Sequence, residues 1–287
     1  MALRFRHRQG SGGGEVNLTS PSQVKAWCIE NGFHPNKVLG QNFLIDRNAL
    51  EAIVDAGLGD LVLQRESRPL PHVLEIGPGL GVLTEEMLKR GCCVTAVEKD
   101  PVLAARLKEA LGNPAGLTVI AGDALDDSTI RQFPFDCMVS NLPYQAGTRI
   151  LLELVKARQL KSMTVLVQTE VAERLVAGPG SKTRGLAGVW AQLDYDVRIV
   201  RKVAASCFWP RPEVGSSVVR LDRHDRNVAF SAEERRLFHS LTKQAFEHRR
   251  KQLGSIFKDM IQSTARAEEL SNDDWITLTK GLINENT

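Results

Sequence analysis

Short apolar runs alternate with amphipathic segments through the middle of this 287-residue chain. The apolar runs predict buried strands at residues 73–76, 94–98, 118–121, 137–140 and 163–168. The segments between them have the apolar spacing of helices that pack one face against a core. Because strands separated by crossover helices form parallel sheets, the pattern predicts an α/β fold with a doubly wound parallel sheet.

Two helices are expected before the first of these strands. Ser20 is a candidate N-cap and Gly32 a candidate stop for the first helix. The second helix follows Asp46, and Gly57 is expected to end it. The polar, proline-containing stretch 64–72 is interpreted as a connector.

The pattern changes in the last third of the chain. Strand candidates at 195–200 and 217–221 are joined by a proline-rich loop and not by a long helix, so we expect an antiparallel pair at one edge of the sheet. After Arg226 the pattern is helical, and it opens with Ser231 and Glu234 at the spacing of a capping box. These features predict three parts: a flexible basic, glycine-rich tail (1–14), a sheet domain (15–225) and a small all-helical C-terminal domain (226–287).

Four consecutive strands of the predicted sheet end in residues suited to ligand binding: Gly77, Glu98, Asp123 and Asn141. In open α/β sheets, ligands bind at the carboxyl ends of the strands. Each residue also has a structural interpretation, namely a tight turn, an exposed strand-end charge, a helix cap and a simple turn. The glycine turn 77–81 differs from the dinucleotide fingerprint, because its third glycine comes one residue early. The coincidence of four such ends predicts one binding crevice.

The fourth strand end continues as Asn141-Leu142-Pro143-Tyr144. The side-chain oxygen of Asn141 and the main-chain oxygen of Leu142 can accept the hydrogens of an exocyclic amine such as adenine N6. Pro143 stiffens the turn, and the Tyr144 ring offers a stacking face for a base. This tetrapeptide therefore suggests chemistry on an amino group of a base.

Composition narrows the possible settings of this chemistry. The five cysteines form no Cys-x-x-Cys pair, which favours a reducing compartment and no structural zinc. No apolar run reaches the roughly 20 residues of a membrane span, so we expect a cytoplasmic protein without a membrane partner. The arginines near the start, from Arg4 to Arg8, leave a short organellar transit peptide as an alternative to a flexible tail.

The charge is unevenly distributed. Residues 201–266 hold 14 Lys and Arg against 7 Asp and Glu, which leaves 23 against 27 elsewhere. The cluster consists of Arg235, Arg236, Lys243, Arg249, Arg250 and Lys251. A solvated helix face is the simple interpretation, but the concentration of positive charge favours a nucleic-acid partner.

Taken together, several segments resemble the S-adenosylmethionine-dependent rRNA adenine dimethyltransferases. The matching segments are 39–44, 75–84, 97–98, 122–124, 141–144, 168–175, 178–186, 208–219 and 245–251. The resemblance runs in order over roughly residues 35–260 and is strongest to the bacterial branch that dimethylates two adjacent adenosines near the 3′ end of small-subunit (16S) rRNA during ribosome biogenesis.

The resemblance implies a Rossmann-like class I methyltransferase sheet, with S-adenosyl-L-methionine as methyl donor, no metal, and immature 30S particles as partner of a monomeric enzyme. The implied cofactor-binding residues are Gln41, Asn42, Leu44, Gly77, Gly79, Glu98, Asp123, Ala124 and Asn141. The implied catalytic residues are Asn141, Leu142, Tyr144 and Phe208. The implied RNA-binding residues are Arg249, Arg250 and Lys251. Methyl transfer would be in line, to the N6 atom of a flipped or unpaired adenine stacked between Tyr144 and Phe208.

Two segments depart from the family pattern. Gln145 to Arg149 replaces a segment that usually has small hydroxyl residues and a proline, and Glu213 stands where lysine is common. The first change puts the helix entry and local RNA contacts in doubt, and the second removes an expected phosphate contact. A DNA adenine methyltransferase, a nicotinamide oxidoreductase and a non-catalytic RNA-binding assembly factor remain as alternatives, each less consistent with the whole set of motifs.

Overall fold

The computed structural model of this protein describes residues 17–36, 39–63, 69–126, 130, 134–227 and 229–284. The predicted tail and most of the predicted connector lie outside these residues. Across the described residues, no helix combines the length and the apolar character needed to cross a membrane.

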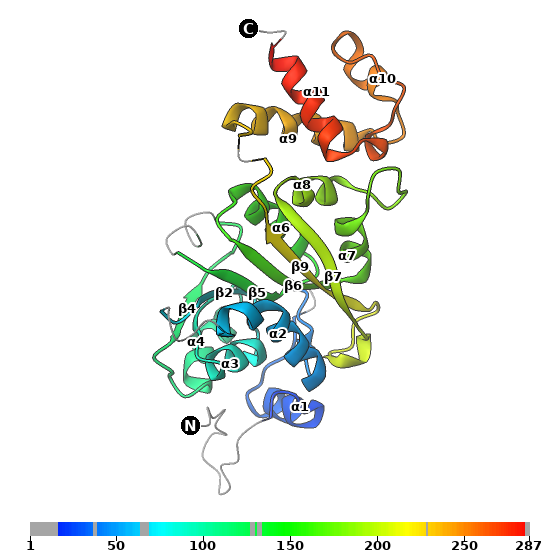
Figure 1. Ribbon diagram of the computed structural model, residues 1–287. Helices are drawn as coiled ribbons and strands as arrows, with labels where there is room; N and C mark the ends of the chain where they lie inside the picture. Colours follow the sequence, from blue (N-terminus) through cyan, green and yellow to red (C-terminus); the bar gives the residue numbers. More distant parts are fainter. Residues whose placement is uncertain are drawn as a thin grey trace, which may run out of the picture.

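A seven-stranded sheet forms the centre of the molecule (Figure 1). Its order is β4-β3-β2-β5-β6-β9-β7. The strands are β2 (His72–Ile76), β3 (Cys93–Glu98), β4 (Leu117–Ala121), β5 (Cys137–Asn141), β6 (Ser162–Gln168), β7 (Tyr195–Val203) and β9 (Ser216–Arg223). β2 to β6 are parallel, whereas β9 is antiparallel to both β6 and β7. The doubly wound sheet and its antiparallel edge pair are confirmed, and the strand order reverses between β2 and β5.

Helices cover both faces of the sheet. The helices of the described residues are α1 (Pro21–Glu30), α2 (Arg47–Leu63), α3 (Val82–Lys89), α4 (Pro101–Ala110), α6 (Gly147–Ala157), α7 (Thr169–Val176), α8 (Leu186–Asp194), α9 (Ala232–Glu247), α10 (Leu253–Phe257) and α11 (Asn272–Asn284), with short 3-10 turns at Ala205–Cys207, Lys258–Met260 and Ala267–Glu269. Of these, α9, α10 and α11 lie together at one end of the sheet domain (Figure 1), where α9 and α11 contact α8. Buried side chains of α1 to α4 join one hydrophobic cluster, and those of α6 to α11 join a second. The sheet therefore lies between two apolar layers, as its buried strands require.

The first predicted helix is confirmed as α1, whereas the predicted end of the second helix is wrong. Ser20 occupies the N-cap position of α1, but its hydroxyl makes no capping bond and lies 3.2 Å from the Ser22 hydroxyl. α2 does not end at Gly57 and continues to Leu63. A Cβ on Gly57 would lie only 2.4 Å from Val139 Cγ2 on β5. This glycine therefore permits close packing of the helix on the sheet instead of ending the helix.

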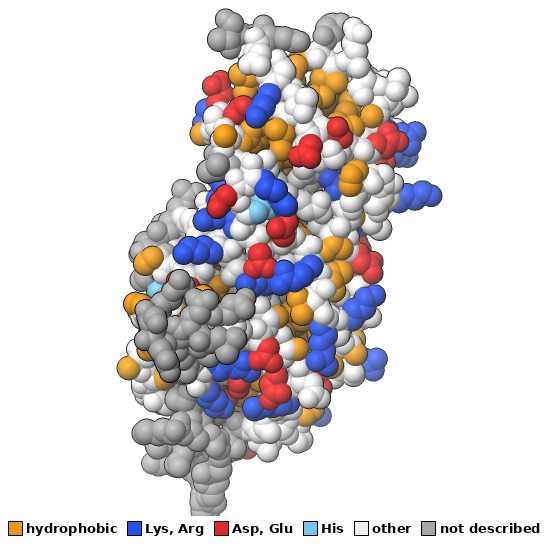
Figure 2. All heavy atoms as spheres, in the orientation of Figure 1, with side chains coloured by type: hydrophobic (Ala, Val, Ile, Leu, Met, Phe, Trp, Pro, Cys, Tyr) orange, Lys and Arg blue, Asp and Glu red, His pale blue; other side chains and the backbone are white. Residues whose placement is uncertain are grey.

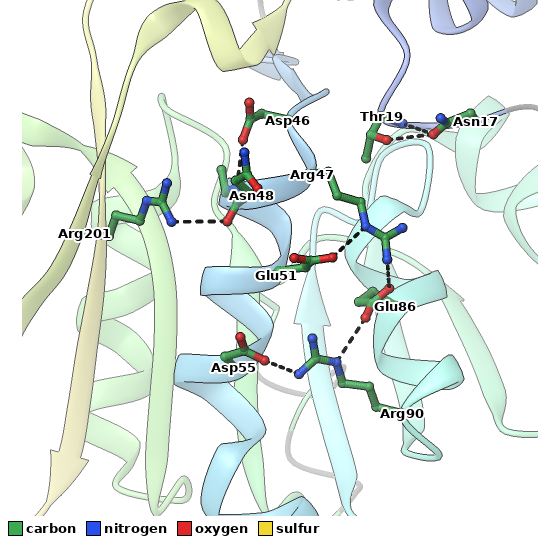
Figure 3. Close-up of polar contacts among 11 residues, drawn as sticks. Asn17, Thr19, Asp46, Arg47, Asn48, Glu51, Asp55, Glu86, Arg90 and Arg201 are labelled. Atoms are coloured by element: carbon green, nitrogen blue, oxygen red, sulfur yellow. Dashed lines mark hydrogen bonds and ion pairs between the residues drawn. The ribbon is translucent and has the colours of Figure 1, made fainter.

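Polar contacts hold α2 in place on its exposed side (Figure 3). The Arg90 guanidinium, just after α3, donates to Asp55 on α2 and, over 3.1 Å, to Glu86 Oε1. On the other flank of α2, Arg201 Nη1 of β7 donates to the Asn48 carbonyl over 3.4 Å. These contacts position the start of α2, and hence the segment just before it, against the sheet.

The C-terminal helices pack on the sheet domain and do not stand apart from it. The predicted capping box of α9 is confirmed, with Ser231 and Glu234 bonded reciprocally. At the boundary, Trp190 Nε1 on α8 donates to Thr242 Oγ1 on α9 over 2.9 Å. Side chains of α9, α10 and α11 share one hydrophobic cluster with β5, β6 and α6. The domain boundary at 225/226 remains a prediction, but the core is continuous across it.

His239 lies at this boundary with its ring 4.7 Å from the Trp190 ring. Among the described residues its buried Nδ1 has no hydrogen-bond partner. Burial, with smaller contributions from the nearby cations Lys156 and Arg235, lowers the imidazole pKa to about 4. Asp194 and Glu153 act in the opposite direction but do not compensate.

We expect His239 to make the protein sensitive to acid. Above pH 6.5 the imidazole is neutral in both states, whereas below it the unfolded chain binds a proton that the folded chain excludes down to about pH 4. Folding stability is therefore lost as the pH falls from 6.5 towards 4, by about 1–2 kcal/mol between pH 7 and 5 for this partly exposed group. Urea unfolding at both pH values should show a smaller loss for His239→Phe than for the wild type. Equal losses would contradict this assignment.

Candidate active site

A cavity of about 320 Å³ opens at the carboxyl ends of β2 to β5. Its walls include all four predicted strand-end residues, Gly77, Glu98, Asp123 and Asn141. The loop before α2 and the turn after β5 also line the cavity. The structure thus brings the strand ends into one crevice beside the switch point between β2 and β5, where open α/β sheets bind ligands.

The glycine turn after β2 forms the floor of the cavity. Gly77, Gly79 and Gly81 all have positive φ values, of +68°, +57° and +88°. A Cβ on Gly81 would lie 2.6 Å from Leu107 Cδ1, and one on Gly79 would lie 3.0 Å from the Phe43 ring. Because side chains are excluded by both backbone conformation and space, the turn leaves its main chain open to a ligand.

Glu98 is 6% exposed at the end of β3. Its Oε2 accepts from the Gly79 amide over 3.0 Å and its Oε1 from the Asp100 amide over 2.9 Å. Burial nevertheless raises the pKa of this carboxyl. Each oxygen retains a lone pair, so the fixed carboxyl group can accept hydrogen bonds from hydroxyl groups in the cavity.

Glu75 is a cavity residue that was not predicted as a site residue. It is 1% exposed, and the Thr84 hydroxyl donates to its Oε2 over 2.5 Å. Burial, with a smaller contribution from the charge of Glu98, raises its pKa to about 8. It lies in β2, two residues before Gly77, and this closeness to the glycine turn was the sequence feature that pointed to it.

Asp123 lines the cavity and also makes a local turn contact. Its Oδ1 accepts from the Leu125 amide over 3.0 Å. Its Oδ2 accepts from Lys99 Nζ over 2.8 Å, and this bond is the main reason that its pKa is lowered. Lys99 also lines the cavity and was not predicted. Ala124 follows Asp123 in the same wall.

The loop before α2 closes one side of the cavity. Gln41 Nε2 donates to Asp100 Oδ2 over 2.9 Å, so Gln41 ties the loop to the N-cap of α4. The Asn42 carbonyl accepts from Asn141 Nδ2 over 3.1 Å. Leu44 is 1% exposed in β1 (Phe43–Leu44). This loop is therefore held at two points on the cavity rim.

Asn141 presents an acceptor that the described residues leave unused. Its Oδ1 is buried and has no hydrogen-bond partner among the described residues. Because a carbonyl can only accept, the bond to Asn42 fixes Nδ2 on that side and turns Oδ1 the other way. Leaving a buried acceptor unpaired costs about 1–3 kcal/mol. Such an oxygen in a cavity wall is suited to a ligand that donates.

Tyr144 and Phe208 are adjacent but do not form an open pair of stacking faces. The Tyr144 hydroxyl is hydrogen-bonded to the Ser216 hydroxyl over 2.7 Å, and burial raises its pKa. The two ring centroids lie 6.5 Å apart at 69°. Phe208 is 2% exposed in β8 (Phe208–Trp209). β8 pairs with β1 in a small sheet that the sequence pattern did not predict. Its predicted stacking role would require its ring to turn.

Leu142 and the first departure from the family pattern lie in the same turn. Leu142 is 1% exposed, and its amide donates to the Leu166 carbonyl on β6 over 3.2 Å. The Gly147 amide donates to the Pro143 carbonyl over 2.7 Å, and α6 begins there. The helix therefore forms despite the altered segment, while Glu213 lies exposed in the loop between β8 and β9.

The basic C-terminal cluster is only partly available to a ligand. Arg235 is bound internally, to Asp194 Oδ2 over 2.6 Å and to the carbonyls of Phe230 and Asn227. Arg249 Nη2 donates to the Lys182 carbonyl over 2.9 Å. Arg236, Lys243, Arg250 and Lys251 are exposed. Sequence clustering did not distinguish these two groups.

Residues 32–280 match the sequence model of a family described as ribosomal RNA adenine dimethylase. A relative from Deinococcus radiodurans, named ribosomal RNA small subunit methyltransferase A, is 47% identical over 207 residues, which span 71% of this chain and 67% of the relative. A relative of the same name from Rhodococcus opacus is 40% identical over 265 residues, or 89% and 86% of the two chains.

Solved structures show the same fold. A dimethyladenosine transferase from Plasmodium falciparum superposes with a TM-score of 0.69 at 23% identity, over 85% of this chain and 98% of the other. The 23S rRNA methyltransferase ErmE gives a TM-score of 0.61 at 24% identity, over 84% and 100%. The family model covers most of the sequence. This chain therefore belongs to the ribosomal RNA adenine dimethylase family.

Proposed function

We propose that this protein converts two adjacent adenosines near the 3′ end of small-subunit (16S) ribosomal RNA to N6,N6-dimethyladenosine during assembly of the subunit. Membership of the family supports the reaction, and the names of the relatives support the small subunit as its substrate. The observation that supports this site most directly is the buried Oδ1 of Asn141, which has no hydrogen-bond partner among the described residues. We further propose a cytoplasmic monomer that acts on immature 30S particles.

The cavity residues fit S-adenosylmethionine as the methyl donor. Glu98 would accept from its ribose hydroxyls and Asp123 from its adenine amine, while the main chain at Gly77 and Gly79 would lie beside its methionine end. Asn42 and Leu44, in the loop tied to Asn141, would close over it, with Gln41 holding that loop in place. When bound, the cofactor supplies an electrophilic methyl group on a sulfonium centre.

The turn after β5 would position the adenine. The N6 lone pair is delocalised into the ring, so an enzyme gains by holding the amino hydrogens in the geometry that exposes it. Asn141 Oδ1 and the Leu142 carbonyl would accept these hydrogens. N6 becomes acidic only as the new bond forms, so no strong general base is needed. The second methylation requires space for the monomethylated amine.

The adenine must leave its base stack to reach this turn. Tyr144 offers one stacking face at the cavity wall. Phe208 is proposed for the other face, and its ring would have to turn out of its edge-on contact with Tyr144 when the base enters.

Lys99 offers a test of the cofactor assignment. We expect Lys99→Met to weaken binding of S-adenosylhomocysteine by about two- to fivefold, because an exposed ion pair that orients Asp123 contributes up to about 1 kcal/mol. Isothermal titration calorimetry measures the change, with Lys108→Met, exposed on α4, as the matched control. Identical affinities for both variants and the wild type would contradict the role of Lys99.

The function itself is tested with the methyl-labelled cofactor and three acceptors: immature small subunits, large subunits and duplex DNA. We expect label only in the small subunits, with digestion and mass spectrometry identifying N6,N6-dimethyladenosine at two neighbouring nucleotides. Label in the large subunit would overturn the choice of substrate, and label in DNA would favour a DNA adenine methyltransferase. Tight RNA binding without any label would favour a non-catalytic assembly factor.

A further inference from the structure

The loop that joins α7 to α8 reaches from the sheet domain to the C-terminal helices (Figure 1). The Gly180 amide donates to the Glu268 carbonyl over 2.8 Å. Arg249 Nη2 donates to the Lys182 carbonyl over 2.9 Å, and its guanidinium lies 3.9 Å from the Glu268 carboxylate. The loop is thus bonded directly to the turn that carries the predicted RNA-binding residues.

A buried arginine holds the other end of this loop. Arg184 is 1% exposed, and its Nη1 donates to the Ala177 carbonyl over 2.7 Å and to Gln192 Oε1 over 3.1 Å. Its Nη2 donates to Asn272 Oδ1 on α11 over 2.9 Å. These acceptors are neutral, so the charge is buried at a considerable desolvation cost, and burial lowers the arginine pKa. The bonds preset the loop conformation on the C-terminal helices.

The loop and the neighbouring turn together present exposed cations. They are Lys182, Arg250, Lys251 and Arg266, the last of which is brought next to this turn by its β-bridge to Gln252. The acidic residues in the same segments are Glu247, Glu268 and Glu269. The Glu268 side chain is 17% exposed, and Glu269 accepts from the Arg266 amide. Figure 2 shows Lys and Arg side chains projecting from this flank of the molecule.

We propose that Lys182 extends the RNA-binding surface of Arg250 and Lys251 across the boundary between the two parts of the protein, so that all three contact RNA phosphates. Ser181 and Thr183 flank Lys182, and their hydroxyls are bonded to each other over 2.8 Å, so the hydroxyl that accepts in this bond can donate its own hydrogen to a phosphate oxygen. Arg249 is a positioning residue that holds Lys182 against the turn. This inference rests on the proposed function and names a further part of its RNA interface.

The test measures binding of an immature small-subunit RNA fragment as a function of salt, by fluorescence anisotropy. Lys182→Ala is expected to weaken binding about three- to tenfold at low salt and to lower the slope of log K against log salt by about 0.7–0.9, the value of one lost phosphate contact. Arg250→Ala should do the same, and Lys182→Arg should restore both quantities. Lys108→Ala, exposed on α4, is the matched control.

Positioning by Arg249 has its own readout. In an Arg249→Gln background, Lys182→Ala should weaken RNA binding less than it does in the wild type, because the lysine is no longer held beside the turn and contributes less to binding. Binding of S-adenosylhomocysteine checks that each variant is folded. This inference alone would be overturned if Lys182→Ala had the same slope of log K against log salt as the wild type while Arg250→Ala had a lower slope. Wild-type protein that binds small-subunit RNA no better than unrelated RNA of equal length would overturn the proposed function instead.

Discussion

Replacing Asn141 with alanine is expected to reduce methyl transfer by at least about a hundredfold, because the variant loses a preorganised partner of the reacting amine. It also loses the bond from Nδ2 to the Asn42 carbonyl, so cofactor binding should weaken to a smaller extent. RNA affinity should stay within about twofold of the wild type, because no cation is removed. Single-turnover transfer with labelled cofactor and separate binding assays distinguish these effects.

Asn141→Asp tests the donor of the same side chain. It keeps an acceptor oxygen but places a carboxylate where the amide nitrogen donated to Asn42, so we expect it to lose both activity and loop closure. Similar rates for the alanine variant and the wild type would show that the unpaired oxygen is not used in the reaction. The acceptor would then have to be sought elsewhere in the turn.

Replacing Trp190 with alanine is expected to lower the free energy of unfolding by about 3–5 kcal/mol, as for other buried aromatic residues. The side chain is 8% exposed, its Nε1 bonds Thr242, and Lys156 Nζ lies 5.3 Å from the ring centroid. Both the sheet domain and the C-terminal helices should be destabilised, because His239 and Thr242 of α9 lie against this side chain. Urea unfolding followed by circular dichroism should show a single transition.

Trp190→Phe separates packing from the hydrogen bond. It keeps most of the ring volume and should cost about 1 kcal/mol for the lost bond together with a smaller packing defect. Two separate transitions in the alanine variant, with the sheet domain as stable as in the wild type, would show that the C-terminal helices fold independently. In that case the boundary at 225/226 would also be a boundary of cooperativity.

Much of the active site could be predicted from the sequence because it lies at strand ends. A buried strand is recognisable from a short apolar run, and in a parallel sheet its last residue has a known edge. Gly77, Glu98, Asp123 and Asn141 were therefore placed together without any knowledge of the turns between them. Glu75 was missed because it lies within the apolar run of β2 itself, where a carboxyl group looks like an exception and not a site.

Contacts between distant segments could not be predicted. In the sequence Lys99 is only a charge after a strand. In the structure β3 pairs with β4, and this pairing places the Lys99 ammonium within hydrogen-bond distance of Asp123. Phe208 carried the right chemistry for stacking, but β8 pairs with β1 and buries its ring. Arg235 counted as a free cation, although Asp194, 41 residues away, binds it.

The sequence by itself determined the alternation of strands and helices in the central sheet, the edge of that sheet where ligands bind and the chemical character of that edge, because periodicity and strand ends are local properties. Tertiary structure alone decided which atoms are used internally and which are left for a ligand. Asn141 is the clearest case: its neighbour Asn42 is 99 residues away in the chain, and their contact fixes the side-chain nitrogen of Asn141 and leaves its oxygen without a partner among the described residues. Hydrogen-bond satisfaction depends on the whole fold, and so does the site.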